Sequence, residues 1–209
     1  YLIMPIVRII NPNDTTIVGI WKITETIEDF FTLIPLSAKS KKLLESRKST
    51  IHQLQFLSIR AILLDLGYSD DSLDYSKNSP ILDGGKKISI SHSNLFSCVI
   101  ISDTNVGIDV QHTNDKINRI AHKFIGYESS YLANNDIKKL SIIWNIKESI
   151  YKIANIEGLD FKNHSLVIPF NNSDDFTFSW LVYKNLRHRY ISYFFTIENY
   201  SFAYLIYSP

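Results

Sequence analysis

The sequence has little of several features that mark special environments. It contains a single cysteine, Cys98, which excludes an internal disulfide framework. No apolar run approaches the roughly 18 residues of a membrane-spanning helix. Cations and anions nearly balance, with 22 Lys and Arg against 21 Asp and Glu and a formal net charge of +1. This balance excludes the broad positive field that drives unspecific binding to nucleic acid or anionic lipid, so we expect neither a nucleic-acid nor a membrane partner.

The composition is that of an ordinary folded protein. The 209 residues are 45% hydrophobic and 13% aromatic, enough to bury one substantial core or two small ones. Cys98 has apolar neighbours and is expected to pack in a core, as a reduced thiol. The segment Tyr1-Leu2-Ile3-Met4-Pro5 lacks the charged region and the cleavage pattern of a signal peptide. We therefore expect a cytoplasmic protein.

The first half of the sequence predicts strands around one long helix. Alternation of apolar and polar residues predicts a strand over 16–24, and helical spacing predicts a helix from Thr50 that Gly67 closes. Ser37 and Thr50 are the expected N-caps. Residues 69–85 are rich in turn formers and read as a loop. Short strands are expected over 88–91, 95–102 and 106–110.

The second half repeats this order without a visible close sequence repeat. Helices are expected over 115–125 and 136–155, followed by aromatic and β-branched strands over 176–183, 190–197 and 201–207. Helices followed by antiparallel strands, twice, predict an α+β fold. We expect two subdomains, residues 1–105 and 106–209, with the active site in the cleft between them.

Asp109 is the first candidate for chemistry. It follows Gly107 within an apolar strand, where an ionised carboxylate is costly unless a cation or several donors satisfy it. One interpretation is an oxygen ligand for Mg²⁺, which takes one or two carboxylates and completes its shell with water and phosphate oxygens. The alternative is a strand-end aspartate that caps a turn.

Glu148 and Lys152 form the second candidate pair. They lie four residues apart and so share a helix face with Trp144 one turn earlier. The plain interpretation is a surface salt bridge. However, Trp144, Ile150 and Tyr151 make this helix apolar nearly all round, which favours a partly buried carboxylate suited to metal binding and proton transfer.

A third group of candidates could bind an anion. His92, between Ser91 and Ser93, offers an imidazole and hydroxyl donors for a phosphate, or is a structural histidine. Arg60 either binds an anion or lies on the solvated side of its helix. A basic run, most simply a solvated helix face, contains Lys39, Lys41, Lys42, Arg47 and Lys48.

In their order along the chain, these segments resemble the 4'-phosphopantetheinyl transferase superfamily. The resemblance rests on Gly107-Ile108-Asp109, on the pattern Trp-x-x-Lys-Glu-x-x-x-Lys over residues 144–152, and on Ser91-His92-Ser93 upstream. A helix over 55–67, a loop containing Pro80 and the stretch Gly158-Leu159-Asp160-Phe161 extend it over most of the chain. The length resembles that of the single-chain, surfactin-type members, which implies a monomer of two similar subdomains related by a pseudo-twofold axis.

The resemblance also implies a reaction. The enzyme would transfer the phosphopantetheine arm of coenzyme A to a serine of an acyl- or peptidyl-carrier protein, giving the holo-carrier and adenosine 3',5'-bisphosphate. Mg²⁺, with Mn²⁺ as the alternative, would be bound by Asp109, Glu148 and, more weakly, Gln111. Glu148 would help to deprotonate the serine and Lys152 would stabilise the leaving phosphate. Contacts to coenzyme A are implied for His92, Ser91, Arg60 and Lys39.

Two positions depart from the family pattern. Relatives often carry an acidic residue where this chain has Gln111, whose amide oxygen is a weaker ligand. A Gly-Lys-Pro loop of many relatives reads Asn78-Ser79-Pro80 here, so Lys77 or Lys86 would have to replace the missing lysine. These departures motivate a second hypothesis, a protein of the same fold that binds coenzyme A or a carrier without turnover. A small nucleic-acid binder is disfavoured because there is no basic aromatic stripe.

Overall fold

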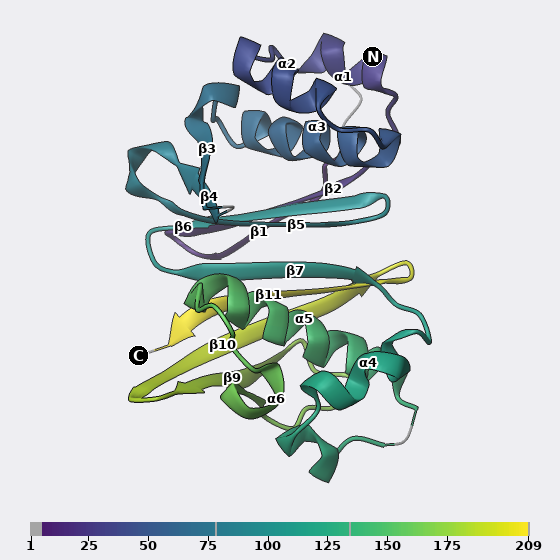
Figure 1. Cartoon of the computed structure of the whole chain (residues 1–209), viewed down its shortest axis with the longest axis vertical. Helices are drawn as coiled ribbons and strands as arrows, with labels where there is room; N and C mark the ends of the chain where they lie inside the picture. The colour runs from purple at the N-terminus through teal and green to yellow at the C-terminus, as the bar shows by residue number, and fades with distance from the viewer. Residues whose placement is uncertain (1–5, 78, 134, 209) are drawn as a thin grey trace. The chain divides into compact units, whose positions relative to one another are not determined.

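The computed structural model describes residues 6–77, 79–133 and 135–208, and it confirms the α+β class. Over these residues the chain forms six α-helices and three antiparallel sheets (Figure 1). It divides into two compact units, Tyr1–Asp103 and Thr104–Pro209. The N-terminal segment Tyr1–Pro5 and Asn78 of the Asn78-Ser79-Pro80 segment lie outside the described residues. None of the helices seen in this part of the chain combines the length and hydrophobicity needed to cross a membrane.

A four-stranded sheet forms the base of the first unit. Its order is β1-β2-β6-β5, from β1 (Ile6–Asn13), β2 (Thr16–Lys22), β5 (Lys87–Ser93) and β6 (Phe96–Ser102). The sequence did not predict β1, an edge strand whose mostly exposed side chains leave little hydrophobic pattern to recognise. Helix α3 (Thr50–Asp65) lies across one face of the sheet (Figure 1). Its N-cap is Ser49 rather than Thr50, and Gly67 follows its end with φ +87°, as expected.

Smaller elements complete the first unit. Helices α1 (Ile27–Leu33) and α2 (Ala38–Glu45) precede α3, and Ser37 caps α2 as expected by accepting a hydrogen bond from the Ser40 amide. The segment predicted to be a loop contains a hairpin of β3 (Leu73–Ser76) and β4 (Ser79–Leu82), which flanking turn residues obscure in the sequence. Short 3₁₀ helices cover Asp70–Ser72 and Asp83–Gly85. Cys98 is buried in the core, as predicted.

The second unit is built on a five-stranded sheet of order β7-β11-β10-β9-β8. Its strands are β7 (Val106–His112), β8 (Ser165–Val167), β9 (Phe176–Tyr183), β10 (Leu186–Ile197) and β11 (Tyr200–Ser208). Helix α5 (Ile137–Ala154) packs on β7 and β11, while α4 (Ile117–Phe124), a 3₁₀ helix (Tyr127–Ser130) and α6 (Phe161–His164) surround it. The sequence did not predict α6 and β8, which are too short to show a period.

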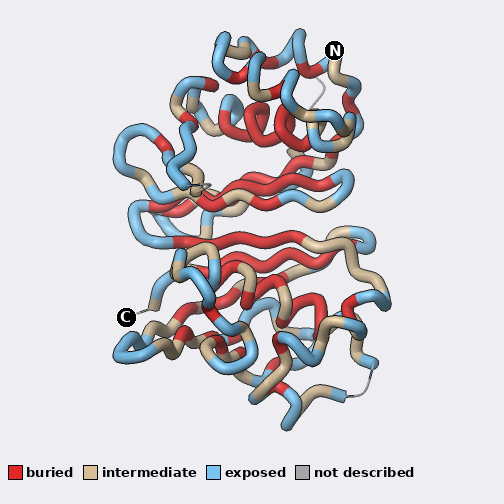
Figure 2. The backbone as a smooth tube through the Cα atoms, viewed as in Figure 1, coloured by how far each residue is buried: buried red, intermediate tan, exposed pale blue. Residues whose placement is uncertain are grey.

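Each unit has its own hydrophobic core between its long helix and its sheet, and the buried residues concentrate there (Figure 2). In the first unit Leu57 and Ile62 of α3 pack with Val99 of β6. In the second, Ile146 and Ile150 of α5 are completely buried in the corresponding place. Because both cores are internal to their units, each long helix is held firmly on its own sheet.

The two units share a topology, which corresponds to the repeated order of helices and strands expected from the sequence. In each, a strand leads through a helix to a hairpin whose second strand pairs with the first: β2, α3, β5 and β6 in one, and β7, α5, β10 and β11 in the other. Both first strands contain Val-Gly-Ile, at residues 18–20 and 106–108. A Cβ added to Gly19 would meet Ile62 of α3 at 2.6 Å, and one added to Gly107 would collide with the backbone of α5.

Candidate active site

The site begins with the close approach of α5 to β7. A side chain at position 107 would overlap the carbonyl oxygen of Ser149, so only glycine lets the helix backbone come this close to the strand. Alternation along β7 places Asp109 on the same face as Gly107, towards α5. The glycine of the Gly-Ile-Asp pattern therefore brings the next acidic residue under the helix.

Asp109 and Lys152 form an ion pair across this contact. The Lys152 Nζ lies 2.8 Å from Asp109 Oδ1 and also donates to the Ile108 carbonyl at 2.8 Å. The Asp109 side chain is 9% exposed and that of Lys152 is 26% exposed. Asp109 is thus a buried, paired carboxylate within the strand, and the turn-capping interpretation is wrong. Lys152 pairs with Asp109 rather than with Glu148, so the plain surface salt bridge is not formed.

Glu148 is half-buried beside the same pair. Burial raises the pKa of Glu148 from its ordinary 4.5 to about 7, the nearby Asp109 carboxylate adds to the increase, and Lys152 opposes it. Two carboxylates thus share one site with a single ammonium group, and one of them gains a proton near neutral pH. An additional cation there would relieve their repulsion.

Gln111 follows Asp109 on the same strand face and is half-buried. Its β11 register partner is Ser201, whose hydroxyl donates to the Gln111 carbonyl at 3.5 Å. The same hydroxyl accepts a hydrogen bond of 2.9 Å from Asn145 Nδ2 of α5. Hydrogen bonds through Ser201 therefore link the helix to the strand at Gln111.

These residues fit a hard divalent cation by their chemistry. Asp109 and Glu148 offer carboxylate oxygens and Gln111 an amide oxygen, the donor types that Mg²⁺ and Mn²⁺ prefer. Burial, and after it the neighbouring Asp109, raises the pKa of Glu148, and a cation bound beside both carboxylates would oppose this increase. Among the described residues there is no cluster of three or more His, Cys, Asp or Glu, so a metal here would depend on the amide or on oxygens from outside the chain.

Arg60, in the first unit, is buried rather than solvated. Its side chain is 2% exposed, its Nε lies 2.7 Å from Asp70 Oδ1, and its guanidinium stacks 3.4 Å from the centre of the Phe56 ring. Burial lowers the pKa of Arg60, while Asp70 opposes the change. Arg60 is already neutralised by a carboxylate, which weakens it as a direct anion contact.

Arg60 and Lys39 line one pocket of about 410 Å³ in the first unit, together with Arg47, Phe56 and Tyr75. Lys39 forms an exposed ion pair with Asp74 at 2.7 Å. Arg47 instead stacks 4.2 Å from the Phe56 ring centre and donates to the Leu43 carbonyl at 2.6 Å. Arg47 is the lining cation most available to an anion; the sequence indicated it only as part of the basic run.

His92 and Ser91 lie next to each other on β5, so their side chains point to opposite faces of the sheet. His92 is exposed. Its register partner Ser97 accepts a hydrogen bond of 2.7 Å from Ser58 of α3, so both Ser97 and His92 lie on the sheet face that α3 covers. Ser91 is buried and points to the other face. The two side chains therefore cannot contact the same phosphate from one face.

Lys77 and Lys86, which could replace the lysine missing from the Asn78-Ser79-Pro80 segment, also lie in the first unit. Ser79 and Pro80 form part of strand β4. Lys86 forms an ion pair with Asp103, whereas Lys77 sits before the hairpin strand with a left-handed φ of 48°. Of the two, Lys77 is not engaged by a carboxylate among the described ion pairs.

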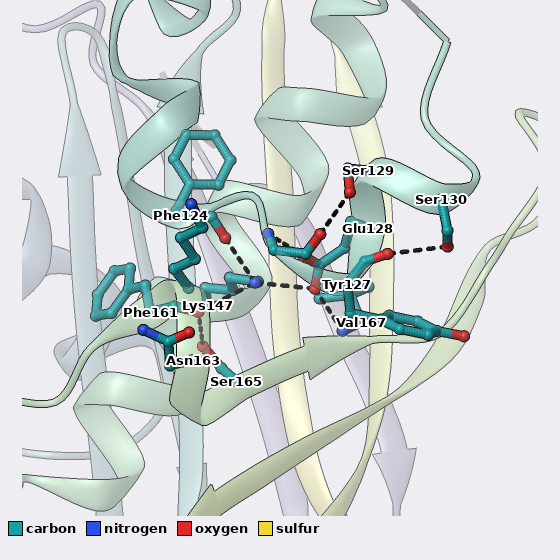
Figure 3. Close-up of polar contacts among 12 residues, drawn as sticks. Phe124, Tyr127, Glu128, Ser129, Ser130, Lys147, Phe161, Asn163, Ser165 and Val167 are labelled. Carbon is teal, nitrogen blue, oxygen red and sulfur yellow. Dashed lines mark hydrogen bonds and ion pairs between the residues drawn. The ribbon is translucent and has the colours of Figure 1, made fainter.

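The most deeply buried charged pair was missed by the sequence analysis. Lys147 precedes Glu148 on α5, and its side chain is 0% exposed, as is that of Glu128, which lies 2.9 Å away (Figure 3). Lys147 also donates to the carbonyls of Phe124 and Phe161 at 2.7 and 3.1 Å. Burial lowers the pKa of Lys147 and Glu128 opposes the change.

Glu128 completes this network by accepting from the amides of Gly126 and Val167, at 3.1 and 2.9 Å. The pair therefore ties the end of α4, the 3₁₀ helix after it, α6 and β8 to the helix that carries Glu148 and Lys152. The adjacent residues Lys147 and Glu148 therefore differ in role. Lys147 faces the interior and stabilises the fold, whereas Glu148 faces the candidate site. A lysine in a nearly wholly apolar helix was the available signal.

Comparisons with known proteins add no assignment. No protein-family model matches the sequence, and a search of curated proteins finds no match.

Proposed function

We propose that this protein is a Mg²⁺-dependent 4'-phosphopantetheinyl transferase, which moves the phosphopantetheine arm of coenzyme A onto a carrier-protein serine. The observation that supports this proposal most is the convergence of Asp109 from β7 with Glu148 and Lys152 from α5. These are the three residues to which the sequence resemblance assigned metal binding and proton transfer. The shared topology of the two units supports the further proposal of two similar subdomains related by a pseudo-twofold axis.

The reaction needs a base, a positive charge and a site for the metal. Glu148, with a pKa raised to about 7 by burial and by Asp109, is suited to accept the serine proton at neutral pH. The serine oxygen forms the new bond to the β-phosphorus of coenzyme A as the bond to the bridging oxygen breaks. Lys152 stabilises or protonates the departing phosphate of adenosine 3',5'-bisphosphate. Asp109, Glu148 and Gln111 would hold Mg²⁺, which supplies charge neutralisation on the pyrophosphate.

The coenzyme A phosphates need cations outside this cluster. We assign Arg47 as the principal contact in the first-unit pocket, because Arg60 and Lys39 are each paired with an aspartate. His92 is accessible for a second contact, and Ser91 would act through its backbone or on the other face of the sheet. Tyr75 and Phe56 offer the pocket aromatic surface.

The alternative is a protein that binds coenzyme A or a carrier without turnover. The specific observations that favour it are Gln111 in place of an acid and Ser79 in place of a lysine. Retention of a paired Asp109 and Lys152 beside a protonatable Glu148 favours the enzyme, since binding alone needs no such arrangement.

The deciding experiment is intact mass spectrometry of an apo carrier protein after incubation with coenzyme A and Mg²⁺. The enzyme should add about 340 Da, the mass of the phosphopantetheine arm, and EDTA should prevent the addition. Asp109→Ala and Glu148→Ala should lower the transfer rate by about 10²-fold or more. Glu157→Ala, an exposed carboxylate, is the matched control and should keep full activity. Coenzyme A binding without mass gain on several carriers would support the binding protein instead.

A further inference from the structure

Asn145 of α5 has a buried amide oxygen that lacks a partner. Its side chain is 0% exposed, and its Nδ2 donates to the carbonyl and the hydroxyl of Ser201 at 2.6 and 2.9 Å. A backbone carbonyl only accepts, so the NH₂ end of this amide must face Ser201 and the orientation of Asn145 is fixed. Its Oδ1 then points elsewhere, buried and without a hydrogen bond. A buried acceptor without a hydrogen bond destabilises the fold, which calls for a donor close by.

Gln111 is the side chain placed to supply that donor. It is the register partner of Ser201, and it shares with Asp109 the strand face that α5 covers. Cβ atoms of register partners on one face lie about 5 Å apart, a distance that the flexible side chain of glutamine can span. Ser201 already accepts from Asn145 and donates to the Gln111 carbonyl, so all three residues belong to one hydrogen-bonded group.

We propose that Asn145 is a positioning residue: its Oδ1 accepts a hydrogen bond from Gln111 Nε2 and so turns Gln111 Oε1 towards Asp109 and Glu148. A free glutamine amide presents its nitrogen or its oxygen with similar ease, yet only the oxygen can ligate a cation. A fixed acceptor on one side of Gln111 decides which end faces the carboxylates. The structure leaves Asn145 Oδ1 without a partner, so this hydrogen bond requires a rotation of the flexible Gln111 side chain. The use of the bond in metal binding rests on the proposed function.

The hydrogen bond is tested first without metal, by ¹⁵N–¹H spectra of the side-chain amides of the full chain. The side chain of Gln111 is half-exposed, so the Gln111→Met variant should fold. The substitution removes the amide donor proposed for Asn145 Oδ1. We expect the side-chain amide resonances of Asn145 to shift in Gln111→Met. In Asn145→Ser, the side-chain amide hydrogens of Gln111 should exchange faster with water than in the unmodified chain. Unchanged Asn145 resonances in Gln111→Met would overturn the proposal and indicate that a buried water satisfies Oδ1. Asn118→Ser on α4 is the control and should alter neither signal.

The positioning role is tested next with Mn²⁺ alone, titrated by electron paramagnetic resonance. Asn145→Ser and Gln111→Met should each weaken Mn²⁺ binding about tenfold, at the lower end of the losses caused by groups that orient metal ligands. The double variant should lose no more than either single one, because both remove the same oriented oxygen. Losses that multiply, or an unchanged affinity in Asn145→Ser, would overturn the positioning role. No Mn²⁺ binding by the unmodified chain would instead refute the metal site of the proposed function, and the spectra would still decide the hydrogen bond.

Discussion

The buried pair of Lys147 and Glu128 makes a prediction that depends only on the fold. We consider Lys147→Met, which keeps the length and apolar stem of the side chain but removes its ammonium group. The Glu128 carboxylate would remain 0% exposed, with two backbone amides as donors and no countercharge. The carbonyls of Phe124 and Phe161 would also lose their donor.

The expected loss follows from these contacts. Removing one member of a buried ion pair costs about 3–5 kcal/mol, since the remaining charge stays in a low-dielectric site. Because two carbonyls are orphaned as well, the free energy of unfolding should fall by about 4–5 kcal/mol, in the upper part of that range. A typical domain has about 5–15 kcal/mol in total, so the variant should lose between about a quarter and nearly all of its stability.

Urea unfolding followed by tryptophan fluorescence measures this loss. Trp144 is a suitable reporter in the second unit, because its ring lies 5.0 Å from that of Phe124, whose carbonyl binds Lys147. Lys138→Met is the matched control: it makes the same substitution on the same helix at an exposed position, and it should change stability by less than about 0.5 kcal/mol.

A second variant separates the charge from the shape. Lys147→Met combined with Glu128→Gln removes both charges, so the pair of changes should cost less than the sum of the single ones by about 2 kcal/mol or more. A loss below about 1 kcal/mol for Lys147→Met, or strictly additive losses, would refute the view that the pair is desolvated and mutually dependent.

Two further predictions concern the candidate site. The pKa of Glu148 is raised to about 7 from an ordinary 4.5, so its ionisation destabilises the folded state as pH rises through this window. Glu148→Gln should therefore melt at a higher temperature than the unmodified chain at pH 8 and at the same temperature at pH 4, and equal differences at both pH values would exclude ionisation as the cause. Gly107→Ala should lower the free energy of unfolding in urea by about 2–3 kcal/mol, because a backbone carbonyl must move. Gly19→Ala should cost less, since it collides with a side-chain methyl group of Ile62 and not with helix backbone. The reverse order would contradict the role of Gly107 in the close packing of α5 on β7.

The sequence predicted the regular parts of the fold for a clear physical reason. Elements rich in apolar residues, such as the helix that starts at Thr50 and the strand that contains Asp109, could be predicted because burial of their own side chains determines their structure. Elements without that signal were missed: the exposed edge strand β1, the hairpin β3–β4 and the four-residue helix α6. Their conformations depend on pairing and packing with distant residues.

For the candidate site, the sequence likewise predicted some residues but not the contacts between them. The pattern of residues indicated Asp109, Glu148 and Lys152, and the structure brings these three together. It could not indicate that Lys152 pairs with Asp109, that Asn145 joins the group through Ser201, or that Arg60 is buried against Asp70. Each of these facts depends on which strand positions meet which helix positions, and spacing within one segment carries no such information.

The strand position two residues after the shared glycine has different occupants in the two units. In the first unit it is Trp21, completely within the core, with its Nε1 donating to Glu25 at 3.2 Å. In the second it is Asp109, held by Lys152. A survey of variants should therefore separate the two places. Substitutions at 21, which leave a cavity in the core, should reduce how much protein accumulates in the cell more than substitutions at 109, whose partner Lys152 is 26% exposed and can reach water.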